Sequence, residues 1–278
     1  MIACTFLLLG VWAFWLEPDS LTVTEHQLSL NWTAERSLRV AILTDLHVGS
    51  PFNGIAKLRE AVDRTNAARP DIICILGDLV FGGVLGGHFV PPEDIAAELQ
   101  RLRAPAGVVA VLGNHDGWFD HDRVRDALER VDVRFVEDTA TRLNTPAGPL
   151  WVAGISDLWT GRHDLGAAMS VVKDDGAPVL LLTHNPDIFP VVPERVTLTL
   201  AGHTHGGQVR LPLAGRPIVP SRYGQRFAAG HVVEGGRHLF VATGLGTSVL
   251  PIRFRVPPAV TILTLLRAGH VATVSANE

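Results

Sequence analysis

The stretch Leu112-Gly113-Asn114-His115-Asp116 places three side chains that bind metals or transfer protons next to one another. It follows the apolar run 107–111, which predicts a buried strand. Polar groups are costly to bury without partners, so three of them at the end of such a strand favour a functional site. Asn, Asp and Gly are also ordinary turn residues. Taken alone, the stretch leaves both a site and a turn open.

The same pattern recurs at four other predicted strand ends. Apolar runs at 39–44, 71–76, 179–182 and 196–200 each predict a buried strand that ends in polar residues. Each polar residue by itself is compatible with a helix cap, a turn or a surface position. Their repetition favours one shared site, and its candidate members are Asp45, His47, Asp78, His184, His203 and His205.

The strand ends are expected to bring these side chains together. In open α/β sheets the carboxyl ends of the strands face one crevice. Asp45 and His47 are two residues apart, as are His203 and His205. In an extended chain, residues two apart point the same way. We therefore expect both side chains of each pair to point into one site and the side chain between them to point away from it.

The donor types predict a pair of metal ions. With Asn114 the set has seven members and no thiolate. Seven ligands are too many for one tetrahedral ion but suit two ions that share a carboxylate. Imidazole and oxygen ligands together suit Mn, Fe or Zn better than Ca or Mg, and the absence of cysteine argues against a structural zinc site.

The elements that must position these residues predict an α/β fold. Helical periodicity covers 55–68, 91–102 and 121–131, and these helices alternate with the early strands, which favours parallel pairing. Later strands are expected at 133–136, 150–155, 238–243 and 259–265, with an edge strand or hairpin arm at 21–30. A mixed sheet, or two sheets packed face to face with helices outside, fits both halves.

Composition narrows the class of protein. The chain has 278 residues, of which 47% are hydrophobic and 19% charged, so it can form one large α/β domain or two small ones. A net charge of −4 without a long basic run argues against nucleic acid as an obligate partner. The two cysteines, Cys4 and Cys74, do not support a disulfide framework.

The N-terminus carries an apolar segment at residues 2–16. It is shorter than the roughly 20 residues of a membrane span, and no basic residue precedes it as in a signal peptide. A membrane anchor is favoured over a signal-like segment or a helix packed on the domain. The expected organisation is this segment at 1–17, a lead-in strand or linker at 18–38 and the main domain at 39–278.

Five blocks in this order resemble the calcineurin-like metallophosphoesterases: Asp45-Leu46-His47, Gly77-Asp78, Gly113-Asn114-His115-Asp116, His184 and Gly202-His203-Thr204-His205. The resemblance spans 39–208 and implies two mixed sheets sandwiched between helices. It implies that one metal takes Asp45, His47 and His205, that the other takes Asn114, His184 and His203, and that Asp78 bridges them. Segments 206–208, 220–224 and 244–248 further resemble a bacterial branch of membrane-associated or exported phosphodiesterases.

The chemistry expected of such a site is hydrolysis. Two neighbouring cations make hydroxide available near neutral pH and neutralise charge on the phosphoryl oxygens. His115 adjoins the ligand Asn114 and is the candidate general acid for the leaving group. Asp116 either raises the pKa of this imidazole or caps the following helix, and both roles stay open.

Other residues are weaker candidates for substrate contacts. Arg216, Arg222, Tyr223 and Arg226 either bind a second phosphate or an anionic head group, or belong to a solvated loop. The segment Asp157-Leu158-Trp159 either edges the pocket or forms a turn with a packing tryptophan.

The sequence thus predicts a dinuclear, metal-dependent phosphoester hydrolase at a membrane of the bacterial cell envelope. A diester or pyrophosphate in a lipid-linked or envelope substrate is favoured, with a UDP-diacylglucosamine-type pyrophosphate, a glycerophosphodiester or a cell-wall polymer as candidates. The alternatives are a nucleotide or cyclic-nucleotide phosphodiesterase and, from another class, a metal-binding scaffold without turnover. The complete ligand set and His115 argue against the scaffold.

Overall fold

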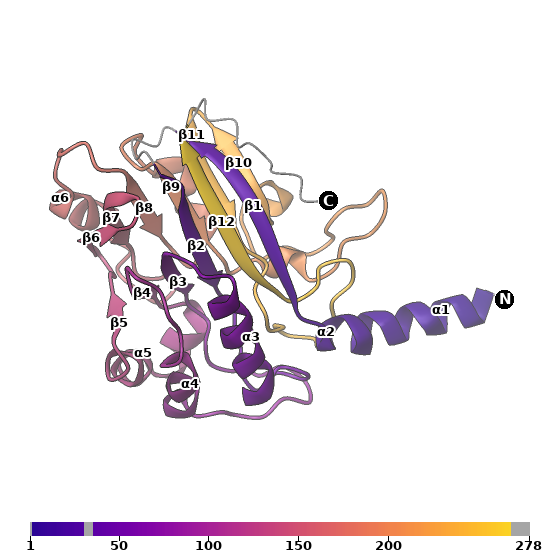
Figure 1. Cartoon of the computed structure of the whole chain (residues 1–278). Coiled ribbons are helices and arrows are strands. Elements are labelled where there is room, and N and C mark those ends of the chain that lie inside the picture. Colours follow the sequence, from indigo (N-terminus) through magenta and orange to yellow (C-terminus); the bar gives the residue numbers. More distant parts are fainter. Residues whose placement is uncertain (1, 31–35, 268–278) are drawn as a thin grey trace, which may run out of the picture.

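The computed structural model describes residues 2–30 and 36–267, and within them the strands form two six-stranded sheets (Figure 1). In the first sheet, β12 runs antiparallel to β2 and the other neighbours are parallel. Its order is β1 (Thr22–Leu30), β12 (Ala259–Arg267), β2 (Leu38–Leu43), β3 (Ile72–Leu76), β4 (Val108–Val111) and β5 (Val133–Phe135).

The second sheet is also mixed. Its outermost pair at each edge is antiparallel and its interior pairs are parallel. Its order is β10 (Gly230–Glu234), β11 (Arg237–Val241), β9 (Leu198–Ala201), β8 (Val179–Leu182), β7 (Gly148–Gly154) and β6 (Thr139–Thr145). The expected pair of mixed sheets is confirmed.

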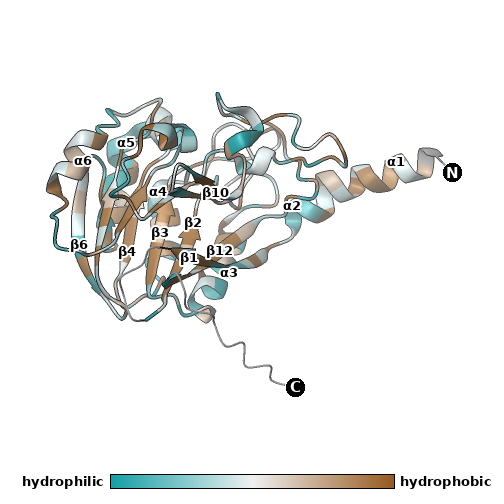
Figure 2. Cartoon of the chain, turned by 90° about the horizontal axis from the view of Figure 1, so that it is seen from above, coloured by the Kyte–Doolittle hydropathy of each residue, from teal (hydrophilic) through white to brown (hydrophobic). Residues whose placement is uncertain are grey.

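The sheets pack face to face over a shared apolar core. Along β3, Ile72, Cys74 and Leu76 face this core, whereas Ile73 and Ile75 face the helices outside. Parallel strands buried on both faces need apolar side chains at every position, which explains the unbroken apolar runs. Figure 2 shows these strands as the most hydrophobic part of the domain.

Helices cover the outer face of each sheet. On the first sheet lie α3 (Ile55–Ala67), α4 (Pro92–Leu99) and α5 (Asn114–Glu129), and on the second lie α6 (Leu165–Val171) and the 3₁₀ helix η2 (Pro186–Val191). Helix α5 begins seven residues before the predicted start at 121 and has a kink at Asp120, where φ is −174°. Its first turn, Asn-His-Asp-Gly, has low intrinsic helix propensity, so the pattern did not reveal it.

The edges of the sheets were harder to predict than their centres. The expected edge strand at 21–30 is β1, which pairs in parallel with β12. Strands β6 and β10 and helix α6 were not expected from the sequence. Both strands carry mostly partly or fully exposed side chains, so they lack the apolar pattern that reveals a central strand.

The N-terminal segment is a helical arm that projects from the body (Figure 1). It consists of α1 (Ile2–Val11), the π-helical turn η1 (Trp12–Leu16) and α2 (Glu17–Asp19). Phe6, Leu7 and Leu8 are about 70% exposed, so their apolar surface is uncovered. The base of the arm is attached to the body, for example where the backbone N–H of Arg253 donates to the carbonyl of Ala13 at 2.9 Å. In the described part of the chain, no helix has both the length and the apolar character needed to cross a bilayer.

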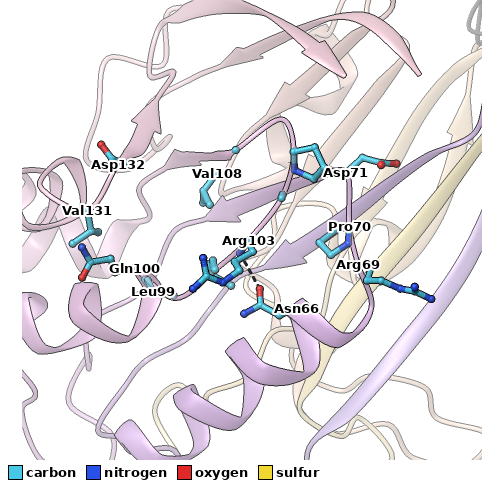
Figure 3. A pocket seen from close by; sticks show the side chains of 14 residues that line it. Asn66, Arg69, Pro70, Asp71, Leu99, Gln100, Arg103, Val108, Val131 and Asp132 are labelled. Carbon is cyan, nitrogen blue, oxygen red and sulfur yellow. Dashed lines mark hydrogen bonds between the residues drawn. The ribbon is translucent and has the colours of Figure 1, made fainter. Parts of the chain in front are cut away.

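A surface cavity of about 770 Å³ lies where the strands of the first sheet begin (Figure 3). Its lining includes Asp71, directly before β3, and Asp132, directly before β5. The predicted ligands follow the opposite, carboxyl ends of the strands. This cavity and the predicted site therefore lie at opposite ends of the strands.

Candidate metal centre

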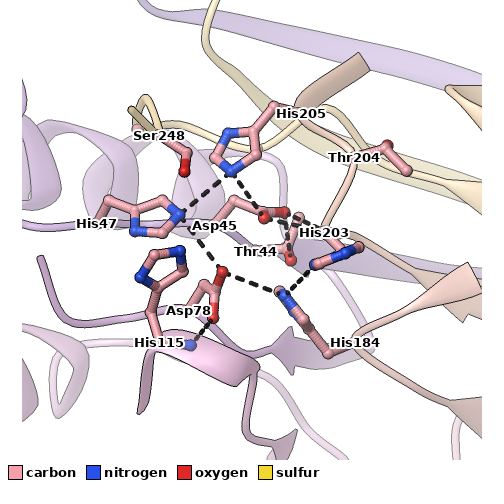
Figure 4. A network of polar contacts seen from close by, with 12 residues as sticks. Thr44, Asp45, His47, Asp78, His115, His184, His203, Thr204, His205 and Ser248 are labelled. Atoms are coloured by element: carbon pink, nitrogen blue, oxygen red, sulfur yellow. Dashed lines mark hydrogen bonds and ion pairs between the residues drawn. The ribbon is translucent and has the colours of Figure 1, made fainter. Parts of the chain in front are cut away.

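The structure gathers the predicted ligands around Asp78 (Figure 4). Oδ2 of this carboxylate lies 3.4 Å from Nε2 of His47 and 3.2 Å from Nε2 of His184. These two histidines come from different sheets, since His47 follows β2 and His184 follows β8. Asp78 thus stands between two groups of donors, as a bridging carboxylate must.

Two clusters of donor atoms share that carboxylate. The first contains Asp45, His47, Asp78 and His205, and the second contains Asp78, His184 and His203. Within each cluster the donor atoms lie within 4.8 Å of one another. In the first, Nε2 of His205 is 3.2 Å from Nε2 of His47 and 3.3 Å from Oδ1 of Asp45. In the second, Nδ1 of His203 is 3.2 Å from Nε2 of His184.

The donors fit a pair of divalent cations. Among the described residues, Oδ1 of Asn114 is buried without a hydrogen-bond partner. Buried polar atoms are normally paired, so this unpaired oxygen on a ligand-type side chain fits a cation ligand. Asn114 is the first residue of α5 and precedes His115, whose backbone N–H donates to Asp78, so it is the candidate for the seventh donor.

The backbone that presents the ligands is not extended, which corrects the expected geometry of the two spaced pairs. Asp45 and His47 have φ values of 50° and 38°, and His203 and His205 have 69° and 50°. These are left-handed conformations, which cost non-glycine residues about 1–3 kcal/mol each and cluster at functional sites. Tight turning of the chain, not strand alternation, brings both members of each pair to the centre.

Outer hydrogen bonds hold the imidazoles in place. Nδ1 of His184 lies 2.6 Å from the carbonyl oxygen of Leu76, and Nδ1 of His47 lies 3.3 Å from that of Val80. A carbonyl can only accept, so each Nδ1 carries the proton and each Nε2 keeps its lone pair for a cation. The hydroxyl of Thr44 donates to Asp45 at 2.8 Å and fixes that carboxylate.

Burial sets the charge states of the centre. It lowers the pKa of His47 to about 4 and that of His203 to about 3, so both stay neutral at neutral pH. Burial also disfavours charge on His184, but the attraction of Asp78 outweighs it and raises the pKa of His184 to about 10. His47 and His203 are therefore neutral nitrogen donors, whereas the ionised Asp78 carboxylate holds His184 protonated. His184 would release that proton on binding a cation, because only the neutral imidazole is a ligand.

Glycines allow the loops to close around the ligands. A Cβ at Gly202 would meet the side chains of Thr44 and Asp45, and one at Gly246 would meet the Cβ of His47 at 2.7 Å. Such distances do not occur between real atoms of this kind, so only glycine permits these contacts. The glycines next to the motif histidines therefore serve packing at the centre.

His115 lies at the edge of the centre. Its backbone N–H donates to Oδ1 of Asp78 at 2.8 Å, and its ring stands edge-on to the ring of His47 with the centroids 4.8 Å apart. A Cβ at Gly82 would collide with its imidazole, so the glycine-rich loop passes directly against the ring. Burial lowers the pKa of His115.

Two roles were predicted for Asp116, and the structure shows the one in which it caps the helix. Its carboxylate accepts from the backbone N–H groups of Asp78, Leu79, Val80 and Gly113, at 2.8 to 3.1 Å. Burial and the nearby Asp78 carboxylate raise the pKa of Asp116 to about 7. The expectation that this residue raises the pKa of His115 is corrected, because its oxygens face backbone amides and burial lowers the pKa of that imidazole.

The arginine and tyrosine candidates make contacts within the segment 187–234 and its neighbours. Arg226 forms an ion pair with Glu234 at 2.6 Å and lies over the ring of Tyr223. Arg222 lies 3.6 Å from Asp187. The backbone N–H of Arg216 donates to Gln225 at 2.9 Å, and its Cβ packs near Gly207. Of the four, Arg216 lies near Gly207 in the turn η3 (His205–Gly207). The substrate roles of all four residues remain predictions.

Sequence reasoning missed Arg253, which is fully buried behind the centre. Its guanidinium donates to the carbonyls of Thr243 at 3.0 Å, Gly244 at 3.2 Å and Gly246 at 2.5 Å, so it fixes the loop that packs on Asp45 and His47. Burial lowers its pKa to about 10. An arginine between apolar residues at 251–254 was the only signal in the sequence.

Comparison with known proteins agrees with this geometry. Residues 38–207 match the family model of the calcineurin-like phosphoesterases. The chain is 30% identical to phosphodiesterase YaeI of Escherichia coli over 254 residues, covering 90% of each protein. It is 29% identical to the uncharacterized metallophosphoesterase YkuE of Bacillus subtilis, covering 91% of this chain and 88% of that one.

A solved structure shares the fold. The NAD nucleotidase of Haemophilus influenzae superposes with a TM-score of 0.50 at 13% identity, over 75% of this chain and 45% of that chain. The family model spans all five motif blocks that form the centre. The chain therefore belongs to the calcineurin-like phosphoesterase family and is a metal-dependent phosphoester hydrolase that uses two divalent metal ions.

Proposed function

We propose that the protein hydrolyses a phosphodiester or pyrophosphate bond in an amphipathic substrate of the bacterial cell envelope. The preference for a diester is supported by the relative that is named a phosphodiesterase. The observation that carries the amphipathic substrate is an apolar cavity beside the metal centre. A UDP-diacylglucosamine-type pyrophosphate fits this description, and a glycerophosphodiester is the simpler candidate.

The cavity measures about 300 Å³ and has the ligand His205 in its lining. Its other walls are largely apolar and come from two loops, with Val209 and Ile218 on one and Val249, Leu250 and Ile252 on the other. Binding pockets are typically apolar with a few polar groups that fix the ligand. A substrate with a hydrocarbon substituent next to its phosphate would place the hydrocarbon against the apolar walls and the phosphate at the metals.

The same loops expose apolar side chains, and the second loop is attached to the base of the N-terminal arm. Ile218 is 77% exposed and Val249 is 75% exposed. Arg253, on the second loop, is hydrogen-bonded to Ala13 at the base of the arm. Large apolar side chains that gather in solvent are typical of membrane or partner contacts. We propose that arm and loops rest on a membrane surface, which would bring a lipid-linked substrate to the cavity.

The proposed residue roles follow from the contacts. When bound, the two cations supply an activated water and neutralise charge on the phosphoryl oxygens. Asp45, His47 and His205 would hold one cation, Asn114, His184 and His203 the other, and Asp78 both. His115 would donate the proton to the leaving oxygen, because it lies against His47 with its ring only partly buried. The negative charge of a bound phosphate would favour its protonated form.

The test uses synthetic phosphodiesters with Mn²⁺ as the added metal. One series carries p-nitrophenol as the leaving group and a methyl, butyl or octyl group as the second substituent. We expect kcat/KM to rise at least tenfold from methyl to octyl, because each buried methylene contributes about 0.8 kcal/mol. Val249→Asp should abolish this rise, whereas Leu213→Asp, on a fully exposed side chain outside the cavity lining, should preserve it.

A second series tests His115. His115→Ala should lower kcat by about 10²- to 10⁴-fold for a diester with an alkyl leaving group, because an alkoxide needs a proton. The loss should be smaller with p-nitrophenol, which departs as a stable anion. Equal losses for both leaving groups would contradict the general-acid role. In the first series, equal values of kcat/KM for all chain lengths would contradict the binding of an apolar substituent.

A further inference from the structure

Two exposed tryptophans border the metal centre in a continuous row of rings. Trp118 stands edge-on to His115 with the ring centroids 5.0 Å apart, and Trp159 stands edge-on to His203 at 4.5 Å. The two indoles stack on each other at 5.9 Å with an interplanar angle of 22°. This pair, called the tryptophan platform below, therefore connects the candidate acid to a ligand of the second cation.

The platform is exposed although its residues are large and apolar. Trp118 is 58% exposed and Trp159 is 50% exposed. Trp118 lies in the first turns of α5, four residues after Asn114, and Trp159 follows β7. Two indoles from distant parts of the chain are thus held side by side in solvent at the edge of the centre. Neither is needed to fill the core.

Hydrogen bonds and backbone packing hold the tryptophan platform in place. Asp157 is buried, and its Oδ2 accepts from the backbone N–H groups of Trp159 at 2.7 Å and Thr160 at 3.0 Å. The other oxygen, Oδ1, is buried without a hydrogen-bond partner among the described residues. A Cβ at Gly117 would overlap the side chain of Thr160, so the two segments that carry the indoles touch. The arrangement is preorganised, which lowers the cost of binding.

We propose that the tryptophan platform binds a planar, π-rich group, such as a nucleobase or an aryl ring, on the leaving-group side of the substrate. The proposal rests on the proposed hydrolysis of a diester, and it assigns the substituent next to His115, whereas the apolar cavity beside His205 takes the other one. Stacking of a base on an aromatic side chain is tolerant of sequence and is a strong term in binding.

The spacing decides how such a ring would bind. A ring inserted between two indoles needs their planes about 7 Å apart, twice the contact distance of about 3.5 Å. The indole centroids are 5.9 Å apart, so the pair is already in contact. The planar group would therefore lie on the free face of the platform, as an extension of the stack, and not in a slot.

The test measures binding of two matched ligand pairs to the Mn²⁺-loaded full chain by calorimetry and by quenching of tryptophan fluorescence. Phenyl phosphate is compared with ethyl phosphate, and uridine 5′-monophosphate with ribose 5-phosphate. We expect the planar member of a pair to bind about tenfold more tightly or better. Trp118→Leu and Trp159→Leu should reduce this ratio to near one, and the Phe variants should retain part of it.

Trp12→Leu is the control, because Trp12 is also exposed but lies on the N-terminal arm. It should leave the ratio unchanged. The pair that shows the preference distinguishes an aryl ring from a nucleobase. A wild-type ratio near one in both pairs, or a ratio that survives both Leu variants with metal content intact, would overturn the proposal. The binding result does not depend on turnover, so failure of the proposed hydrolysis would be recognised separately in the diester assays.

Discussion

The carboxylate of Asp116 accepts a hydrogen bond from the backbone N–H of Asp78 at 2.8 Å. The residue next to the candidate acid thus holds in place the segment that carries the shared metal ligand. Asp78 in turn accepts from the backbone N–H of His115 at 2.8 Å, so the two loops are tied in both directions. Two of the five motif blocks support each other through their backbones.

Asp116→Asn tests this arrangement. Each oxygen of the carboxylate accepts from two backbone N–H groups, and an amide NH₂ in place of either oxygen would face two donors. We expect the variant to lose about 3 kcal/mol of unfolding free energy in urea titrations, because buried donors without acceptors are costly. Asp126 is exposed on the same helix, so Asp126→Asn should change the unfolding free energy by less than about 0.5 kcal/mol. Equal stability of both variants would contradict the role.

Asp78→Asn tests the shared ligand. The substitution keeps the size of the side chain but removes the charge that balances two cations. We expect the metal content measured by mass spectrometry to fall from two ions to one or none per chain. Diesterase activity should fall by more than the roughly 10- to 100-fold typical of substitutions outside the ligand shell. Two retained ions at wild-type activity would refute the bridging role.

Arg253→Met tests the buried guanidinium. Methionine has a similar length but leaves the carbonyls of Thr243, Gly244 and Gly246 without this donor. We expect a loss of about 3–5 kcal/mol in unfolding free energy, the range found when a buried charged network loses one partner. Arg255→Met, which changes an exposed neighbour, is the control for loss of charge. Similar stability of the two variants would show that the buried contacts contribute little.

His121 makes stability depend on pH. The hydrogen bond that Nε2 of His121 donates to the Glu137 carboxylate raises the pKa of His121 to about 9, and Glu137 also accepts from the backbone N–H of Leu112 at 3.0 Å. A raised folded pKa stabilises the protein below the unfolded value of 6.5, and this contribution disappears as the pH rises through about 9.

His121→Gln should therefore destabilise the protein more at pH 6 than at pH 10, as measured by urea titration. The difference should be modest, because His121 is partly exposed and solvent screens the pair. An NMR titration of the imidazole should place its pKa well above that of a free histidine. A difference that is independent of pH would contradict the ion pair.

The central strands were predictable and the edges were not, for a physical reason. Strands β3 and β8 are buried on both faces, so every position is apolar and the pattern is unmistakable. Strand β6 and helix α6 have only one buried residue each. Strand β6 forms by pairing with β7, and α6 packs on β6, so both elements depend on contacts with a neighbouring element that their own apolar pattern does not contain.

The sequence by itself determined the chemical inventory: seven ligand-type side chains after buried strands, a histidine beside them and no thiolate among them. Only the tertiary structure decided which backbone conformation presents them, since Asp45 and His203 take left-handed turns that long-range contacts enforce. It also revealed Arg253 and the tryptophan platform. Arg253 and the two tryptophans act through partners that are near in space but separate along the chain. Residue type and spacing in the sequence do not record such proximity.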